Sequence, residues 1–184
     1  MPFSHSTVSN ASLAVWNICA EASTAAEVVQ VANDNSVGQV VISGAGPALD
    51  RAISAAQKAG ARKAVRLAVS IAAHSPLMLH AQETFSAAVA AAPITDPVVP
   101  LVGNVTARSL PSAADIRLDL CGQLTNRVRW TETIQFMASQ GIINIVEFGS
   151  GSVLTGLLKR IDRSLVGFNV GTPADLEKLS QAMG

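Results

Sequence analysis

The sequence predicts an α/β fold in which short apolar strands alternate with helices. Two observations support this prediction. Runs of β-branched residues, for example at 39–43 and 142–148, alternate with segments in which apolar residues recur at helical spacing. In addition, 49% of the 184 residues are hydrophobic and only 14% are charged. This composition indicates extensive burial, in one substantial core or in two small ones that share an interface.

The first third of the chain predicts a small subdomain. Turn-forming residues at 33–38 separate two β-branched runs and therefore predict a hairpin. Pro47 near its start and Gly60 at its end bound the helix that follows. The expected elements are a strand over 3–8, a helix over 10–23, strands over 27–32 and 39–43, a helix over 47–59 and a strand over 62–70. This order, β-α-β-β-α-β, is the ferredoxin-like split arrangement.

The rest of the chain predicts alternating helices and parallel strands. The expected elements are a helix over 75–92, a strand over 98–102, helices over 112–126 and 131–140, a strand over 142–148, a helix over 152–161, a strand over 165–170 and a helix over 172–183. We place the boundary between the two parts, 1–70 and 71–184, near residues 70–76. Because both faces of a parallel sheet need cover and this part has few elements to supply it, we expect an exposed apolar sheet face.

Composition and patterning exclude several classes of protein. Thirteen basic residues balance thirteen acidic ones and tyrosine is absent, so the chain lacks the positive field and the stacking aromatics of nucleic-acid binding proteins. No apolar run approaches the ~20 residues of a membrane span, and the first residues lack a basic signal region. We therefore expect a cytoplasmic protein. Cys19 and Cys121 are expected to be reduced core thiols, because neither has a CxxC or Cys/His neighbour.

His74 is the main candidate for chemistry. It lies between a predicted strand and a helix that begins with a proline, the position where α/β enzymes hold reactive groups, so it could act as a general base. From spacing alone, a capping or packing role is the alternative. His5, near the terminus, and His80, on a helix face, are expected to have structural or solvent roles. The sequence contains no G-x-S-x-G elbow, so this base has no evident nucleophile.

A glycine-rich loop at 149–152 follows an apolar strand and opens a helix. Its N–H groups could bind an anion. However, it matches neither the P-loop nor the G-x-G-x-x-G pattern, and a tight turn between strand and helix is the main alternative.

Five segments, in this order, resemble one known family. They are VANDNSVGQVVISG (31–44), AHSPLM (73–78), VPLVGNVTA (99–107), QLTNRVRW (123–130) and EFGSGSVLTGLLKR (147–160). Together they resemble the malonyl-CoA:acyl carrier protein transacylases and the related acyltransferase domains of fatty-acid and polyketide synthases. The resemblance covers about residues 18–179.

The resemblance implies a ferredoxin-like small subdomain, here 1–70, followed by the C-terminal part of an α/β-hydrolase-like subdomain, here 71–184. It implies malonyl transfer from coenzyme A, through a serine in a G-H-S-x-G elbow, to the phosphopantetheine thiol of acyl carrier protein, without a metal or other cofactor. His74 matches the histidine that deprotonates the serine, and Gln123 matches the position whose backbone carbonyl orients it. Asn35, Asn104 and Ser75 are implied as residues of the substrate pocket.

The sequence also departs from the family. It lacks the N-terminal half with its serine elbow, the arginine that pairs with the malonyl carboxylate, and the glutamine of the oxyanion hole. Val37, Ser150 and Arg127 replace prolines that are common in the family. Ala73, before the histidine, leaves the acyl-group preference open.

Three hypotheses follow. The chain is expected to be a truncated transacylase that is active only when a separate chain supplies the other half. Alternatively, it is a non-catalytic remnant that binds acyl carrier protein or has a structural role. The third hypothesis is an independent phosphate-binding domain that uses the loop at 149–152.

Overall fold

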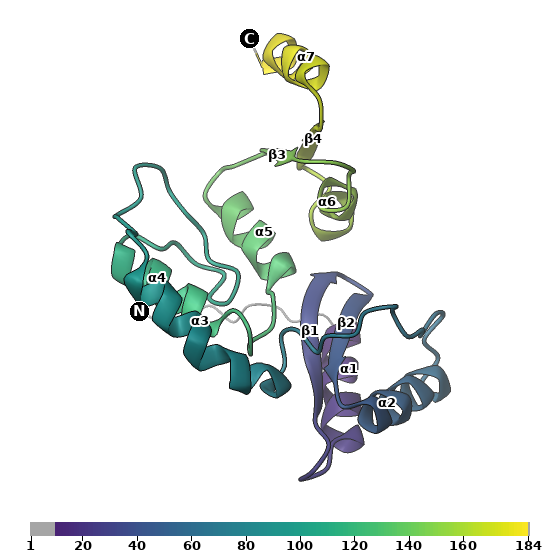
Figure 1. Cartoon of the computed structure of the whole chain (residues 1–184). Helices are drawn as coiled ribbons and strands as arrows, with labels where there is room; N and C mark the ends of the chain where they lie inside the picture. Colours follow the sequence, from purple (N-terminus) through teal and green to yellow (C-terminus); the bar gives the residue numbers. More distant parts are fainter. Residues whose placement is uncertain (1–9, 184) are drawn as a thin grey trace, which may run out of the picture. The chain divides into compact units, whose positions relative to one another are not determined.

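The structure, a computed structural model, describes residues 10–183 (Figure 1). The chain divides into two compact units, Met1–Thr133 (unit 1) and Ile134–Gly184 (unit 2). Its elements are α1 (Asn10–Ala22), β1 (Val29–Ser36), β2 (Gln39–Gly44), α2 (Gly46–Lys58), η1 (Pro76–Met78), α3 (Leu79–Ala91), α4 (Ala113–Gly122), α5 (Trp130–Ser139), β3 (Asn144–Phe148), α6 (Thr155–Ile161), β4 (Val166–Val170) and α7 (Pro173–Met183). The predicted subdomain boundary at 70–76 lies elsewhere than the division between these units, and the assignment of 1–70 and 71–184 to two subdomains stays a prediction.

The hairpin of β1 and β2 forms as predicted. The strands pair antiparallel from Val29↔Gly44 to Ser36↔Gln39, with two register shifts along β1. A two-residue turn joins them, and its second residue, Gly38, has a φ of +79°, a conformation that glycine adopts without steric cost. Helices α1 and α2 pack with the hairpin (Figure 1). The buried core consists of Cys19, Ala22, Val29, Val31, Ala48 and Ala52.

The predicted strand over 62–70 is wrong. This segment follows α2 without regular structure, and Val65, Leu67 and Val69 are each more than half exposed. The alternation of charged and apolar residues suits a strand, but within residues 10–183 no neighbouring strand pairs with this segment, and an unpaired strand leaves its N–H and C=O groups without a ladder. The predicted strand over 3–8 lies outside the described residues, so the full ferredoxin-like order stays a prediction.

Unit 2 contains a parallel pair of strands. β3 and β4 pair in register from Asn144↔Val166 to Phe148↔Val170, as the sequence predicts. Helices α6 and α7 both pack on β4. Leu157, Leu158 and Leu165 supply buried apolar side chains of this unit.

The third predicted parallel strand, over 98–102, is wrong. Only Val102 makes a bridge there, antiparallel to Ser109, while Val98 is fully exposed and Val99 is 67% exposed. β-branched composition made this segment resemble a strand, but it has no strand partner in the described chain. Within that same part of the chain, no helix is both long and apolar enough to span a membrane.

Candidate functional site

His74 occupies an unusual backbone conformation just before η1. Its φ is +59°, in the left-handed region that residues other than glycine rarely adopt, at a cost of about 1–3 kcal/mol. The next residue, Ser75, is fully buried and is the N-cap of η1. Its hydroxyl donates to Ala72 O at 2.7 Å and accepts from Leu77 N–H at 3.3 Å. Ser75 therefore fixes the turn that presents His74, and its predicted place in a substrate pocket stays a prediction.

The His74 ring binds the C-cap of α4. Nδ1 lies 3.0 Å from Gln123 O. Because a carbonyl oxygen only accepts hydrogen bonds, Nδ1 must carry the hydrogen, and in the neutral ring Nε2 then keeps its lone pair. This is the tautomer that a general base needs. The contact uses the backbone of Gln123, so the structure brings together the two residues that the resemblance implies as catalytic.

The end of α4 is held by side chains from several other segments. Gln82 Nε2 donates to Cys121 O, and Asn126 Nδ2 donates to Gly122 O at 2.9 Å. Gln30 Nε2 donates to Thr125 O at 2.9 Å. The carbonyls at the C-terminal end of a helix carry its negative dipole end. His74 Nδ1 lies at this end of the helix, at Gln123 O.

A buried carboxylate holds the loop that contains Asn104. Asp119, on α4, is 6% exposed and accepts hydrogen bonds from Asn104 N–H at 3.1 Å, Thr106 N–H at 3.0 Å and Thr106 Oγ1–H at 3.0 Å. Gly103 makes this possible, because a Cβ at that position would lie 2.3 Å from Asp119 Oδ1. Gly103 and Asp119 therefore form a sterically matched pair.

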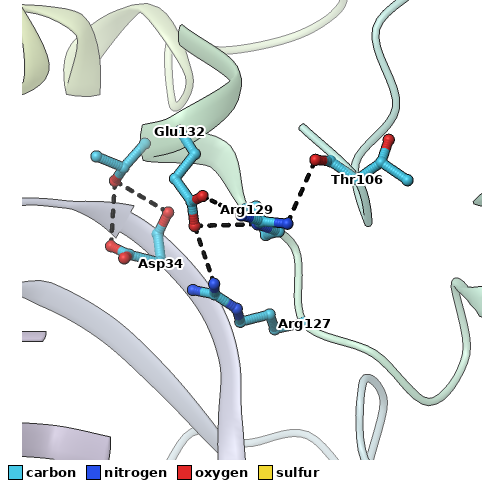
Figure 2. Close-up of polar contacts among 6 residues, drawn as sticks. Asp34, Thr106, Arg127, Arg129 and Glu132 are labelled. Carbon is cyan, nitrogen blue, oxygen red and sulfur yellow. Dashed lines mark hydrogen bonds and ion pairs between the residues drawn. The ribbon is translucent and has the colours of Figure 1, made fainter. Parts of the chain in front are cut away.

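A charged cluster connects this loop with the start of α5 (Figure 2). Arg129 Nε and Arg127 Nη2 both donate to Glu132 Oε1, at 3.0 and 2.9 Å, and Arg129 Nη2 donates to Oε2. Arg129 Nη1 also donates to Thr106 O at 3.3 Å, and its backbone N–H donates to Asn104 O at 3.0 Å. The cluster therefore fixes the backbone at Asn104 and at Thr106, two residues further along the loop.

The same cluster lies against the N-terminal part of unit 1. The Arg127 guanidinium is 4.5 Å from the centroid of the Trp16 ring, which is the geometry of a cation–π contact. Thr131 Oγ1 donates to Asp34 at 3.1 Å, and the backbone of Val128 pairs with β1 at Ala32 and Asp34. These contacts tie the start of α5 to α1 and β1.

Burial and charge shift pKa values in the cluster. Burial lowers the pKa of Arg127, and the negative charge of Glu132 partly opposes this. Burial would raise the pKa of Glu132, but the hydrogen bonds and positive charges of Arg129 and Arg127 outweigh it and lower that pKa below its usual range. Glu132 is therefore bound more strongly as a carboxylate than as a neutral acid.

This shift predicts a pH-dependent loss of stability. A carboxyl group with a lowered folded-state pKa stabilises the fold above its unfolded pKa of about 4.3, and this contribution disappears as the pH falls through the folded pKa. At pH 7, Glu132→Gln is expected to lower the free energy of unfolding by about 1–3 kcal/mol. The difference from the unsubstituted chain should shrink toward pH 3. Urea unfolding between pH 3 and 7 measures it.

Glu83→Gln is the matched control for that experiment. Glu83 is exposed on α3, so its substitution should change stability by less than about 0.5 kcal/mol at every pH. A cost of Glu132→Gln that stays constant across the pH range would contradict the assignment.

The remaining residues considered from the sequence are Asn35, Asn104, His80 and His5. Asn35 is half-buried in β1, and Asn104 is exposed; among the hydrogen bonds of the described residues, none links either side chain to His74. Their roles in a substrate pocket stay predictions. His80 is exposed, with Nδ1 3.0 Å from Leu77 O, which agrees with the structural role expected for it. His5 lies outside the described residues.

Of the two cysteines, Cys19 lies in the core as expected, whereas Cys121 does not. Both are free, Cys19 is buried and Cys121 is half-buried. Burial raises the pKa of Cys19 to about 11, so this thiol stays protonated and unreactive at neutral pH.

The carboxylate of Glu147 binds the start of α6, just after the glycine loop at 149–152. Glu147 accepts hydrogen bonds from the N–H groups of Leu154 and Thr155, from the Thr155 hydroxyl and from Asn169 Nδ2, at 2.9 to 3.1 Å. These hydrogen bonds, above all the one from Thr155 N–H, lower the pKa of Glu147. The donors at the start of α6 are thus already used, which favours the tight-turn interpretation over a phosphate site. Within residues 10–183, no group of three or more His, Cys, Asp or Glu side chains could hold a metal ion.

Sequence reasoning missed two residues that shape this region. Gln30 is the one polar residue in the run Val28–Ala32, and Asp119 is an acidic residue between two leucines of a helix. A polar residue at a position expected to be buried needs a specific partner. That signal was present in the sequence, but it does not name the partner.

Comparisons with known proteins find relatives in the curated sequences but no family model. No family model matches the chain. The curated malonyl-CoA–acyl carrier protein transacylase of Salmonella typhimurium is 42% identical over 156 residues, which is 85% of this chain and 50% of that protein. The Bacillus subtilis (strain 168) transacylase is 37% identical over 156 residues, 85% of this chain and 49% of that protein. This chain is homologous to part of the malonyl-CoA–acyl carrier protein transacylases.

Solved structures of malonyl transacylases match the fold as well. That of the Xanthomonas oryzae pv. oryzae transacylase is 46% identical, with a TM-score of 0.86 over 91% of this chain and 53% of that one. A malonyl transacylase in complex with its type II PKS acyl carrier protein is 38% identical, with a TM-score of 0.88 over 92% of this chain and 55% of that one. The predicted α/β acyltransferase fold is confirmed. The chain spans about half the length of the transacylases it matches.

Proposed function

We propose that this chain supplies the base of a malonyl transferase, acting on a serine nucleophile carried by a segment outside this sequence. The observation that supports the proposal is the 3.0 Å contact between His74 Nδ1 and Gln123 O, which leaves Nε2 as the proton acceptor. Homology to malonyl-CoA–acyl carrier protein transacylases supplies the substrate class.

The reaction follows from this geometry. Nε2 takes the proton of the serine hydroxyl as its oxygen attacks the thioester carbonyl of malonyl-CoA, and the resulting imidazolium returns a proton to the departing coenzyme A sulfur. In the second half, Nε2 takes the proton of the phosphopantetheine thiol of acyl carrier protein while that sulfur attacks the acyl-serine. The imidazolium then returns a proton to the serine oxygen. The carbonyl of Gln123 accepts the hydrogen bond of Nδ1–H in both halves and so keeps the ring oriented.

Complementation tests the proposal. The part of the Salmonella typhimurium transacylase that this chain does not match is co-expressed with the chain, and the complex is purified. Intact-protein mass after incubation with malonyl-CoA should show a malonyl adduct on the added part, and acyl carrier protein should then become malonylated. The chain alone should show no adduct.

Two results would contradict the proposal. One is a stable complex that gives neither adduct nor transfer. The other is a malonyl adduct on the chain by itself, which would place a nucleophile within this sequence. Binding of acyl carrier protein by an inert complex would instead favour the non-catalytic alternative.

A further inference from the structure

Gln30 lies in β1, but its side chain binds two segments far away in the sequence. Nε2 donates to His74 O at 2.7 Å and to Thr125 O at 2.9 Å. A primary amide nitrogen carries two hydrogens, so both are used, one for each carbonyl. Gln30 therefore joins the turn that carries His74 to the turn that follows α4.

These two hydrogen bonds complete a closed circuit of contacts that includes the candidate base. Gln30 binds the His74 backbone, and the His74 imidazole binds Gln123 O at 3.0 Å. Two residues further along the chain, Thr125 O accepts the second hydrogen bond of Gln30 and closes the circuit. The distance between Nδ1 and Gln123 O depends on where the two turns lie. Gln30 fixes both turns through one rigid planar amide.

The His74 backbone needs such support. Its φ of +59° is disfavoured for a residue with a side chain and persists only where surrounding contacts impose it. The Ser75 hydroxyl fixes the residues after His74, through Leu77 N–H, and also binds Ala72 O. Gln30 binds the His74 carbonyl itself, between these two contacts.

We propose that Gln30 is a positioning residue that holds His74 in the Nδ1–H tautomer, with Nε2 as the proton acceptor. The inference rests on the proposed function, in which Nε2 of this tautomer is the base. The tautomer of the His74 imidazole itself can be measured without any substrate or added protein.

The direct test is nitrogen NMR of the chain labelled with ¹⁵N-histidine, at a pH where the ring is neutral. The His74 signals are identified by their loss in His74→Asn. In the unsubstituted chain, the ¹⁵N shifts should show hydrogen on Nδ1 and none on Nε2. Gln30→Met keeps the length of the side chain but removes both donors, so the ring should become a mixture of the two tautomers.

Gln57→Met is the matched control. Gln57 Nε2 donates to an exposed carbonyl, Ala64 O, at 3.4 Å, so the same substitution there should leave the His74 shifts unchanged. Gln30→Asn keeps an amide that is too short to reach both carbonyls, and it should also give mixed tautomers. This second variant decides the question if Gln30→Met does not fold.

The activity of the complemented complex provides an independent test of the role of Gln30. In the complemented complex, Gln30→Met should lower kcat by about 10- to 100-fold, the effect of a misplaced catalytic group, with little change in the KM for malonyl-CoA. A folded Gln30 variant that keeps a single Nδ1–H tautomer would overturn the inference. An inactive unsubstituted complex would count against the proposed function alone, because the NMR result does not depend on transfer.

Discussion

His74→Asn is expected to lower the kcat/KM of the complemented complex by about 10²- to 10⁴-fold, the usual contribution of a general base. An asparagine side chain cannot take up the proton of the nucleophile at neutral pH. Among residues other than glycine, asparagine is one of the most tolerant of the left-handed backbone at φ +59°. The substitution therefore removes the base while keeping the turn.

The measurement is the rate of malonyl transfer to acyl carrier protein, with circular dichroism and thermal unfolding as checks on the fold. His80→Asn is the matched control, because His80 is exposed on α3 and should change the rate less than twofold. Retention of full activity by His74→Asn would show that another group serves as the base.

Asp119→Leu is expected to destabilise unit 1 by about 3 kcal/mol or more. Leucine has a similar branched shape but no acceptor, so it leaves the donors of Asn104 and Thr106 without a partner. Each donor that is cut off from water without a partner costs about 1–3 kcal/mol. Urea unfolding monitored by Trp fluorescence measures the change. Loss of stability below about 0.5 kcal/mol would show that water replaces the carboxylate at no cost.

The steric pairing with Gly103 makes a sharper test. Gly103→Ala places a methyl group 2.3 Å from Asp119 Oδ1, so either the carboxylate or the loop must move. In the Asp119→Ala background the clash with the carboxylate is absent and only the contact with Thr106 Oγ1, at 2.7 Å, remains, so Gly103→Ala should cost less than in the unsubstituted chain. Gly156→Ala is the control, since a Cβ there meets no atom within 4 Å and alanine favours a helix. Additive costs of Gly103→Ala and Asp119→Ala would contradict the pairing.

Local signals in the sequence predicted much of the fold. Turn residues placed the hairpin, and Pro47, Pro76 and Ser112 marked the starts of three helices within a few residues. The strands predicted at 62–70 and 98–102 were wrong because alternation and β-branched composition report how a segment could pair, whereas a strand exists only where a neighbour is present.

The candidate site was predicted in part. His74 was identified by its place before a helix and by a resemblance to a family, which also implied the carbonyl of Gln123. Gln30 and Asp119 could not be assigned, because their partners lie in segments far away in the chain. Local patterns carry no information about which buried polar groups meet.

The span of the contacts made by Gln30 has a consequence for folding. Its hydrogen bond to Thr125 closes a loop of 95 residues, and that of Thr131 to Asp34 closes one of 97, whereas the hairpin closes through a two-residue turn. Loop-closure entropy rises with the logarithm of loop length, so the long loops cost about 3 kcal/mol more than the hairpin. High contact order of this kind slows folding. We therefore expect the surroundings of His74 to form late in folding, after the hairpin and the helices that pack on it.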